Sequence, residues 1–136
     1  MPVQLEMVLR ILLAAVLGMI VGFERFHAHK PAGLRTHMLV CIGSALFTVV
    51  SIYGFSSTNS DPSRVAAGVV AGIGFLGAGA IIHAQDGGLH GLTTASSIWA
   101  VAAIGLAAGT GMYIVAAVAT GIVLVVLYVM KRVEKP

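Results

Sequence analysis

The chain has 136 residues, of which 58% are hydrophobic and only 10% are charged, and its formal net charge is +3. Soluble domains are about 45–50% apolar and about 25% charged. A soluble fold of this length could not bury so much apolar surface, because small domains leave a large share of their surface in water. The composition therefore excludes an ordinary soluble domain and predicts an integral membrane protein.

Five apolar runs follow one another, and each is close to the roughly 20 helical residues that cross a bilayer. They cover residues 5–23, 36–55, 64–83, 92–108 and 112–131. Turn-forming residues separate them, such as Pro31-Ala32-Gly33 and Gly109-Thr110-Gly111. The runs are continuous rather than alternating, which favours helices over barrel strands. The first run lacks a basic leader, so we expect a transmembrane helix there rather than a signal peptide. We predict an all-α domain over residues 1–136, an integral membrane bundle of five transmembrane helices.

The cations at the helix ends predict the orientation of the bundle. With five spans, six of them fall on one side and two on the other. The six are Arg25, Lys30, Arg35, Lys131, Arg132 and Lys135, and the two are Arg10 and Arg64. Lys and Arg collect on the cytoplasmic side of membrane proteins. We therefore expect the N-terminus outside and the C-terminus in the cytoplasm. These scattered cations form no basic patch with aromatics between them, so no nucleic-acid partner is expected.

Two local patterns predict ionic contacts at the helix entries. Glu6 precedes Arg10 by four residues, the favourable order for an ion pair on one helix face. The alternative for Arg10 is a cation that faces a functional cavity. Asp61-Pro62 is typical of a helix N-cap followed by proline, and Asp61 is also one helical turn from Arg64.

The third run is rich in glycine, and its pattern has two interpretations. Gly72, Gly74 and Gly77 formally match the dinucleotide-binding fingerprint, but they lie inside an apolar span, which excludes that interpretation. Small residues four apart instead let membrane helices approach closely. Residues 64–83 are therefore predicted to be the central helix. The packing glycines are Gly18, Gly22, Gly68, Gly72, Gly74, Gly77, Gly79, Gly105 and Gly109. Of these, Gly74 and Gly77 point away from the shared face, and the alternative for them is a kink or the close approach of a substrate.

Polar residues suggest a metal site only weakly, and no catalytic site. Two sets are conceivable metal ligands, namely Glu24, His27, His29 and His37, or His83, Asp86 and His90. Neither set has the spacing of a strong metal motif, so solvated histidines are the favoured interpretation and the metal stays unassigned. Thr93, Thr94, Ser96 and Ser97, followed by Trp99, could line a polar path or bond to neighbouring helices. Cys41 lies in an apolar run, where a thiolate is disfavoured, and we expect no enzyme.

Several short motifs follow one another in order from about Gly18 to Tyr113. They are Gly22-Phe23-Glu24-Arg25, residues 32–40 (AGLRTHMLV), residues 61–66 (DPSRVA), residues 72–79 (GIGFLGAG), residues 91–95 (GLTTA) and Trp99. Together they closely resemble the MgtC/SapB family of bacterial membrane proteins. The resemblance implies that the polar residues and glycines that match the family motifs are functional. These are Glu24, Arg25, Arg35, Thr36, Asp61, Arg64, Gly72, Gly74, Gly77, Gly79, Thr93, Thr94 and Trp99.

The resemblance implies a bacterial inner-membrane protein associated with growth in low magnesium and with survival of pathogens inside host cells. The family name suggests magnesium transport, with Mg²⁺ as a possible ligand. Some members are thought to act on other membrane proteins, including the ATP synthase, or on phosphate uptake. Longer members add a soluble cytoplasmic domain, so this chain, which runs to Pro136, is expected to match the membrane domain alone. Two hypotheses follow: a modulator that acts by helix contact, with a homodimer expected, or an ion or solute transporter.

Overall fold

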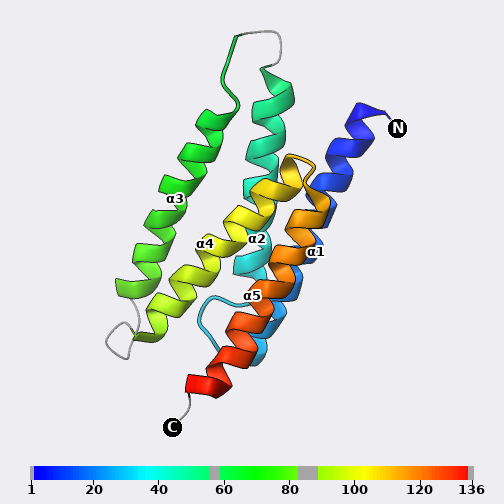
Figure 1. Cartoon of the computed structure of the whole chain (residues 1–136). Helices are drawn as coiled ribbons and strands as arrows, with labels where there is room; N and C mark the ends of the chain where they lie inside the picture. Colours follow the sequence, from blue (N-terminus) through cyan, green and yellow to red (C-terminus); the bar gives the residue numbers. More distant parts are fainter. Residues whose placement is uncertain (1, 56–58, 83–88, 135–136) are drawn as a thin grey trace.

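The computed structural model describes residues 2–55, 59–82 and 89–134. Within these ranges the backbone forms five α-helices and one π-helical turn (Figure 1). They are α1 (Val3–His27), α2 (Leu34–Val49) with its π-helical continuation η1 (Val50–Gly54), α3 (Ser63–Ile82), α4 (Leu89–Gly109) and α5 (Tyr113–Glu134). All five helices are long and apolar enough to cross a membrane, which confirms the predicted all-α bundle of five spans.

The described helices extend past the predicted apolar runs where polar residues can continue the helix. α1 continues through Glu24 and Arg25 to His27, and the backbone N–H of Ala28 still donates to the carbonyl oxygen of Glu24. α2 begins at Leu34, directly after Gly33, and its final residues take the wider π-helical form. A charged or polar side chain at a helix end does not interrupt a helix, although it ends an apolar run.

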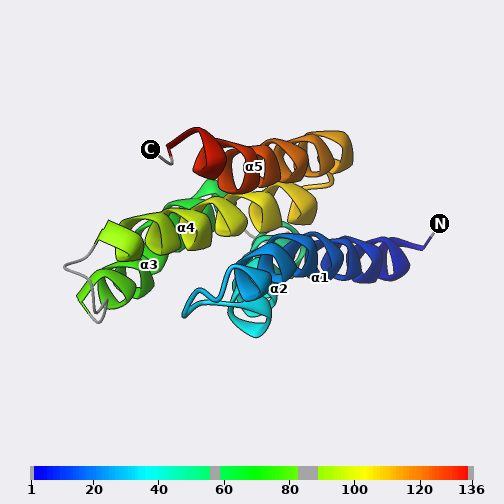
Figure 2. The same ribbon diagram turned by 90° about the horizontal axis from the view of Figure 1, so that it is seen from below.

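Successive helices run in opposite directions, so the bundle has two distinct ends (Figure 1). The N-terminus lies at one end, together with the turn between α4 and α5. The C-terminus lies at the other end, together with the connection from α1 to α2. We call these the N-terminal end and the C-terminal end of the bundle. Seen from below, α4 lies in the middle of the bundle, with α5 on one side and the pair formed by α1 and α2 on the other, and it also packs on α3 (Figure 2).

The core lies among α1, α2, α4 and α5. Its fully buried residues are mostly small, such as Ala14, Cys41, Ala45 and Ala108, which lets the helix backbones approach closely. Buried residues make up 50% of the α4 span but only 6% of the α3 span. The prediction that residues 64–83 form the central helix is therefore wrong within this chain, because α4 occupies that place and α3 lies at the edge.

Candidate functional site

Four of the predicted packing glycines lie where α2 crosses its neighbours. A methyl group added to Gly18 would lie 2.8 Å from the Cys41 Cβ atom, and one on Gly22 would lie 2.9 Å from the Leu34 carbonyl oxygen. Gly105 meets the backbone of Cys41 in the same way, and Gly109 would bring a methyl 2.8 Å from the Ala45 carbonyl oxygen. No side chain fits at such distances. α2 is thus held between α1 and α4 by backbone contacts that only glycine permits.

The glycines of α3 have different surroundings. Gly77 is buried, and a methyl group there would lie 3.4 Å from the Cβ atom of Ala95 in α4. Gly68, Gly72, Gly74 and Gly79 have nothing within 4 Å of such a methyl group. Because each residue turns a helix by about 100°, Gly68, Gly72 and Gly79 share a face that lies roughly opposite Gly77. One face of α3 therefore packs on α4, and the glycine face is uncovered in this chain.

An apolar groove of about 620 Å³ separates α3 from α2. Gly68, Gly72 and Leu76 line it on α3, and Gly43 and Phe47 line it on α2. Gly43 also has nothing within 4 Å of an added methyl group. Phe75, on the same side of α3 as Gly68, is 82% exposed. We call this feature the α2–α3 groove; its glycines leave space that an apolar chain or helix can enter.

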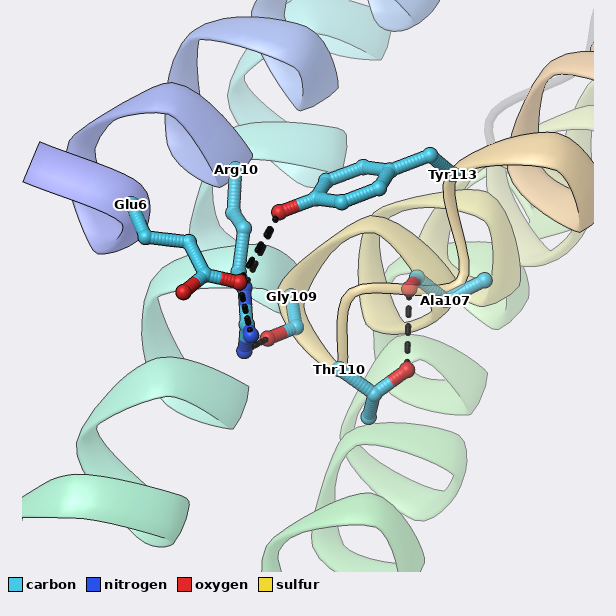
Figure 3. A network of polar contacts seen from close by, with 6 residues as sticks. All are labelled: Glu6, Arg10, Ala107, Gly109, Thr110 and Tyr113. Atoms are coloured by element: carbon cyan, nitrogen blue, oxygen red, sulfur yellow. Dashed lines mark hydrogen bonds and ion pairs between the residues drawn. The ribbon is translucent and has the colours of Figure 1, made fainter. Parts of the chain in front are cut away.

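At the N-terminal end of the bundle, Arg10 connects three elements (Figure 3). Its guanidinium pairs with Glu6 at 2.8 Å, which confirms the ion pair predicted from their spacing. Nη1 also donates to the carbonyl oxygen of Gly109 at 3.0 Å, and Nε donates to the hydroxyl of Tyr113 at 3.3 Å. Arg10 is only 7% exposed, so its guanidinium is largely shielded from solvent. Its hydrogen-bond partners at the turn between α4 and α5 compensate for the lost solvation.

That turn depends on one glycine next to the arginine. Gly111 has a φ angle of +87°, which L side chains rarely adopt. A methyl group there would also lie 3.0 Å from Nη2 of Arg10. Gly111 therefore allows both the reversal of the chain and the close approach of the guanidinium.

At the C-terminal end of the bundle, Arg25 is almost fully buried, with 1% of its surface exposed. Glu24 accepts from its Nε atom at 2.7 Å and from Nη2 at 3.2 Å. Its Nη1 atom is buried and has no hydrogen-bond partner, and the same holds for Oγ1 of Thr94. A buried charged donor without an acceptor is costly, so Arg25 has capacity for one more acceptor.

A histidine links α2 to α4 near the same end. Nδ1 of His37 lies 2.9 Å from the Gly33 carbonyl oxygen, and Nε2 lies 2.9 Å from Oγ of Ser97. A carbonyl oxygen only accepts, so Nδ1 carries a hydrogen. The Thr94 carbonyl oxygen lies 2.8 Å from the Ser97 hydroxyl, whose single hydrogen can go either to that oxygen or to Nε2 of His37. His37 is fully buried, and its ring is therefore a structural connection between the two helices.

The remaining polar residues singled out from the sequence lie on the surface. Arg35, Thr36, Thr93 and Arg64 are exposed, and Trp99 is 55% exposed. Asp61 is exposed too, and its Oδ1 atom accepts from the Ser63 backbone nitrogen at 3.0 Å and from the Ser63 hydroxyl at 2.7 Å. Asp61 thus caps the start of α3 as predicted. The predicted ion pair of Asp61 with Arg64 does not form.

The two conceivable metal sets do not gather a ligand cluster in the part of the chain that the structure describes. No group of three or more His, Cys, Asp or Glu side chains there could hold an ion. In the first set, His37 bonds to Gly33 and Ser97, and Glu24 bonds to Arg25. The second set, His83, Asp86 and His90, lies outside the residues whose side chains are described.

The sequence did not predict the long-range partners of Arg10 and of His37. Tyr113 and the carbonyl of Gly109 hold Arg10 from 103 and 99 residues away, and no local pattern signals such a contact. The pairing of His37 with Ser97 spans 60 residues. The only sequence signal for it was the presence of both side chains near the same predicted end of the bundle.

Comparison with known proteins identifies the family. The model of the MgtC family matches residues 11–136. The chain belongs to the MgtC family. Curated relatives are similar to this MgtC-family chain over most of its length. A protein of Escherichia coli (strain K12) named "Putative magnesium transporter YhiD" is 50% identical over 114 residues, covering 79% of this chain and 53% of that protein.

Two further relatives are named MgtC and SapB, the two names that the family resemblance combines. Protein MgtC of Brucella abortus (strain 2308) is 48% identical over 113 residues, covering 83% of this chain and 46% of its own length. Protein SapB of Bacillus subtilis (strain 168) is 38% identical over 114 residues, covering 79% of this chain and 49% of its own length. The chain therefore spans about half the length of the curated relatives it matches. No solved structure matches it.

Proposed function

We propose that this MgtC-family chain is a small membrane modulator, which acts by placing a transmembrane helix of another protein in the α2–α3 groove. The first partner we propose is a second copy of the chain, which gives a homodimer. We also propose that other membrane proteins bind by the same kind of contact. The ATP synthase and phosphate-uptake proteins are the candidates that the family resemblance suggests.

The observation that carries this proposal is the set of uncovered glycines along the groove. Gly43, Gly68 and Gly72 line it, and none has an atom within 4 Å of an added methyl group. A glycine inside a helix costs about 1 kcal/mol of helix stability relative to alanine. Elsewhere in this chain, Gly105 and Gly109 offset that cost by close backbone contact with α2. A docked helix would give Gly68 and Gly72 the same kind of contact.

The cellular setting is part of the proposal. The cations at the C-terminal end of the bundle support a cytoplasmic C-terminus and an external N-terminus, by the positive-inside rule. With the family assignment, this favours the inner (plasma) membrane of a bacterium. We propose that the chain serves adaptation to low magnesium and survival inside host cells.

Self-association in membranes tests the helix-docking proposal. Two differently tagged copies are co-expressed, extracted in mild detergent and recovered through one tag. The double variant Gly68→Leu, Gly72→Leu fills the groove, and we expect recovery of the second copy to fall at least tenfold. Gly74→Leu is the matched control, because Gly74 is equally uncovered but does not line the groove. Equal recovery from both variants, with equal thermal stability, contradicts the proposal.

Transport of Mg²⁺ or another ion is the second candidate, and the name of the Escherichia coli relative favours it. Two buried cations, Arg10 and Arg25, occupy opposite ends of the bundle and disfavour a path for Mg²⁺ between them. Both of their carboxylate partners, Glu6 and Glu24, are already paired. Flux of Mg²⁺, phosphate and protons into proteoliposomes tests this candidate. If liposomes that contain the folded protein show more flux than empty liposomes, the transport function is supported. If they show no more flux, the transport function is ruled out.

A further inference from the structure

A second cavity, of about 510 Å³, lies at the C-terminal end of the bundle between α4 and α5. It is separate from the α2–α3 groove and shares no lining residue with it. α1 contributes Arg25 at its inner side, and the connection after α1 contributes Lys30. Figure 2 shows α5 lying along α4 at this end, where the C-terminus also lies. We call it the α4–α5 cavity.

The polar part of this cavity is basic. Arg25, Lys30 and Lys131 line it, against a single carboxylate there, Glu134. Arg25 is the buried member, and its Nη1 atom has no hydrogen-bond partner although Glu24 occupies the other two nitrogens. Thr93 and Ser96 are also among the lining residues. Cationic side chains together with hydroxyl groups are the kind of donors that bind a phosphate group.

The rest of the cavity is apolar and continues along the two helices. Ala100 lines it on α4, and Ile122, Val123, Val126 and Met130 line it on α5. A free anion would leave this wall uncovered, whereas an acyl chain would cover it. Basic pockets between membrane helices on the cytoplasmic side are typical binding sites for acidic lipid head groups.

We propose that the α4–α5 cavity binds an acidic phospholipid. Its phosphate group lies among Arg25, Lys30 and Lys131, and an acyl chain lies along the apolar wall. The bound lipid places a negative charge beside these three cations and fills the space between α4 and α5. This site is independent of helix docking in the α2–α3 groove.

Native mass spectrometry of the full chain in detergent tests the site, with short-chain phosphatidylglycerol as the probe and phosphatidylcholine for comparison. Each lysine near a membrane surface changes the affinity for acidic lipid about fivefold, so the double variant Lys30→Gln, Lys131→Gln is expected to bind phosphatidylglycerol about 25-fold more weakly. The single variant Lys131→Gln is expected to lose about fivefold. Arg132→Gln is the matched control, because Arg132 neighbours Lys131 but does not line the cavity.

A second variant separates a phospholipid from free phosphate. Ala100→Phe fills the apolar wall and keeps every charge, so it is expected to weaken phosphatidylglycerol binding at least tenfold. Equal losses in Arg132→Gln and Lys131→Gln, or no loss in the double variant, overturn the site. Displacement of phosphatidylglycerol by millimolar inorganic phosphate, with no effect of Ala100→Phe, shows a free anion as the ligand and overturns the phospholipid assignment.

Discussion

Arg10, in the second turn of α1, donates a hydrogen bond from Nη1 to the carbonyl oxygen of Gly109, the last residue of α4, at 3.0 Å. The last carbonyls of a helix have no partner within the helix, so an external donor stabilises them. A cation at the negative end of the α4 dipole adds a favourable charge interaction. The N-terminal part of α1 is thereby attached to the turn that leads into α5.

Replacement of Arg10 tests this attachment. Arg10→Met keeps much of the apolar stem and removes all three hydrogen bonds. We expect a loss of about 2 kcal/mol in the free energy of unfolding, measured by denaturant titration in detergent, because hydrogen bonds to charged groups contribute about 1.5–3 kcal/mol. Glu6→Gln is the control and should lose clearly less stability than Arg10→Met, since Glu6 is partly exposed and Gln can still accept. Equal losses would show that the bond to Gly109 contributes little.

Gly105 and Gly68 should respond to alanine with opposite signs. Gly105→Ala forces a methyl group into the Cys41 backbone, and overpacking costs about 1–3 kcal/mol. Gly68→Ala meets nothing within 4 Å and gains up to about 1 kcal/mol of helix propensity. Thermal unfolding of the monomer in detergent measures both. A stabilised Gly105→Ala variant would refute the close crossing of α2 and α4.

The bond between His37 and Ser97 predicts a difference between two neighbouring serines. Ser97→Ala leaves Nε2 of His37 buried without its partner, and we expect a loss of about 1 kcal/mol. Ser96→Ala should have almost no effect on stability, because the exposed Ser96 hydroxyl donates only to Leu92 of its own helix. Unfolding titrations of the two variants measure the difference, and identical values would argue against a structural role for His37.

Asp61 makes the start of α3 sensitive to acid. The Ser63 hydroxyl and amide donate to its carboxylate, and the Arg64 charge adds to this, so the pKa of Asp61 lies below its ordinary value of 3.8. A lowered pKa means that the cap stabilises the helix above pH 3.8 and is lost as the pH falls through the lower value. The protection of the amides in the first turn of α3 against hydrogen exchange, relative to the intrinsic exchange rate at each pH, should therefore fall at acid pH. Asp61→Ala should abolish that dependence; if the variant keeps it, another group is responsible.

Local spacing was sufficient to predict some of these contacts. The pairing of Glu6 with Arg10 and the cap by Asp61 depend on residues within four positions of each other, and the structure contains both. The five spans were predictable because a bilayer demands long apolar runs. The bond from Arg10 to Gly109 was not predictable, since it needs the path of the whole chain.

The glycines show why helix arrangement is harder to predict than helix location. Gly68 and Gly105 look alike in sequence, as both lie four residues before another glycine in an apolar run. Only Gly105 meets a helix of its own chain. A small-residue pattern indicates that a helix can be approached closely, but not whether the partner helix belongs to the same polypeptide.

Leu76 and Val70 provide the most direct test of helix docking in the α2–α3 groove. They are 46% and 52% exposed on α3, and only Leu76 lines the groove. A photoreactive amino acid is placed at each position in turn and activated in intact membranes. We predict a protein crosslink, with a second copy of the chain as the first product, from position 76 and not from position 70. Lipid adducts alone from position 76, or equal protein crosslinks from both, would contradict the docking of a helix there.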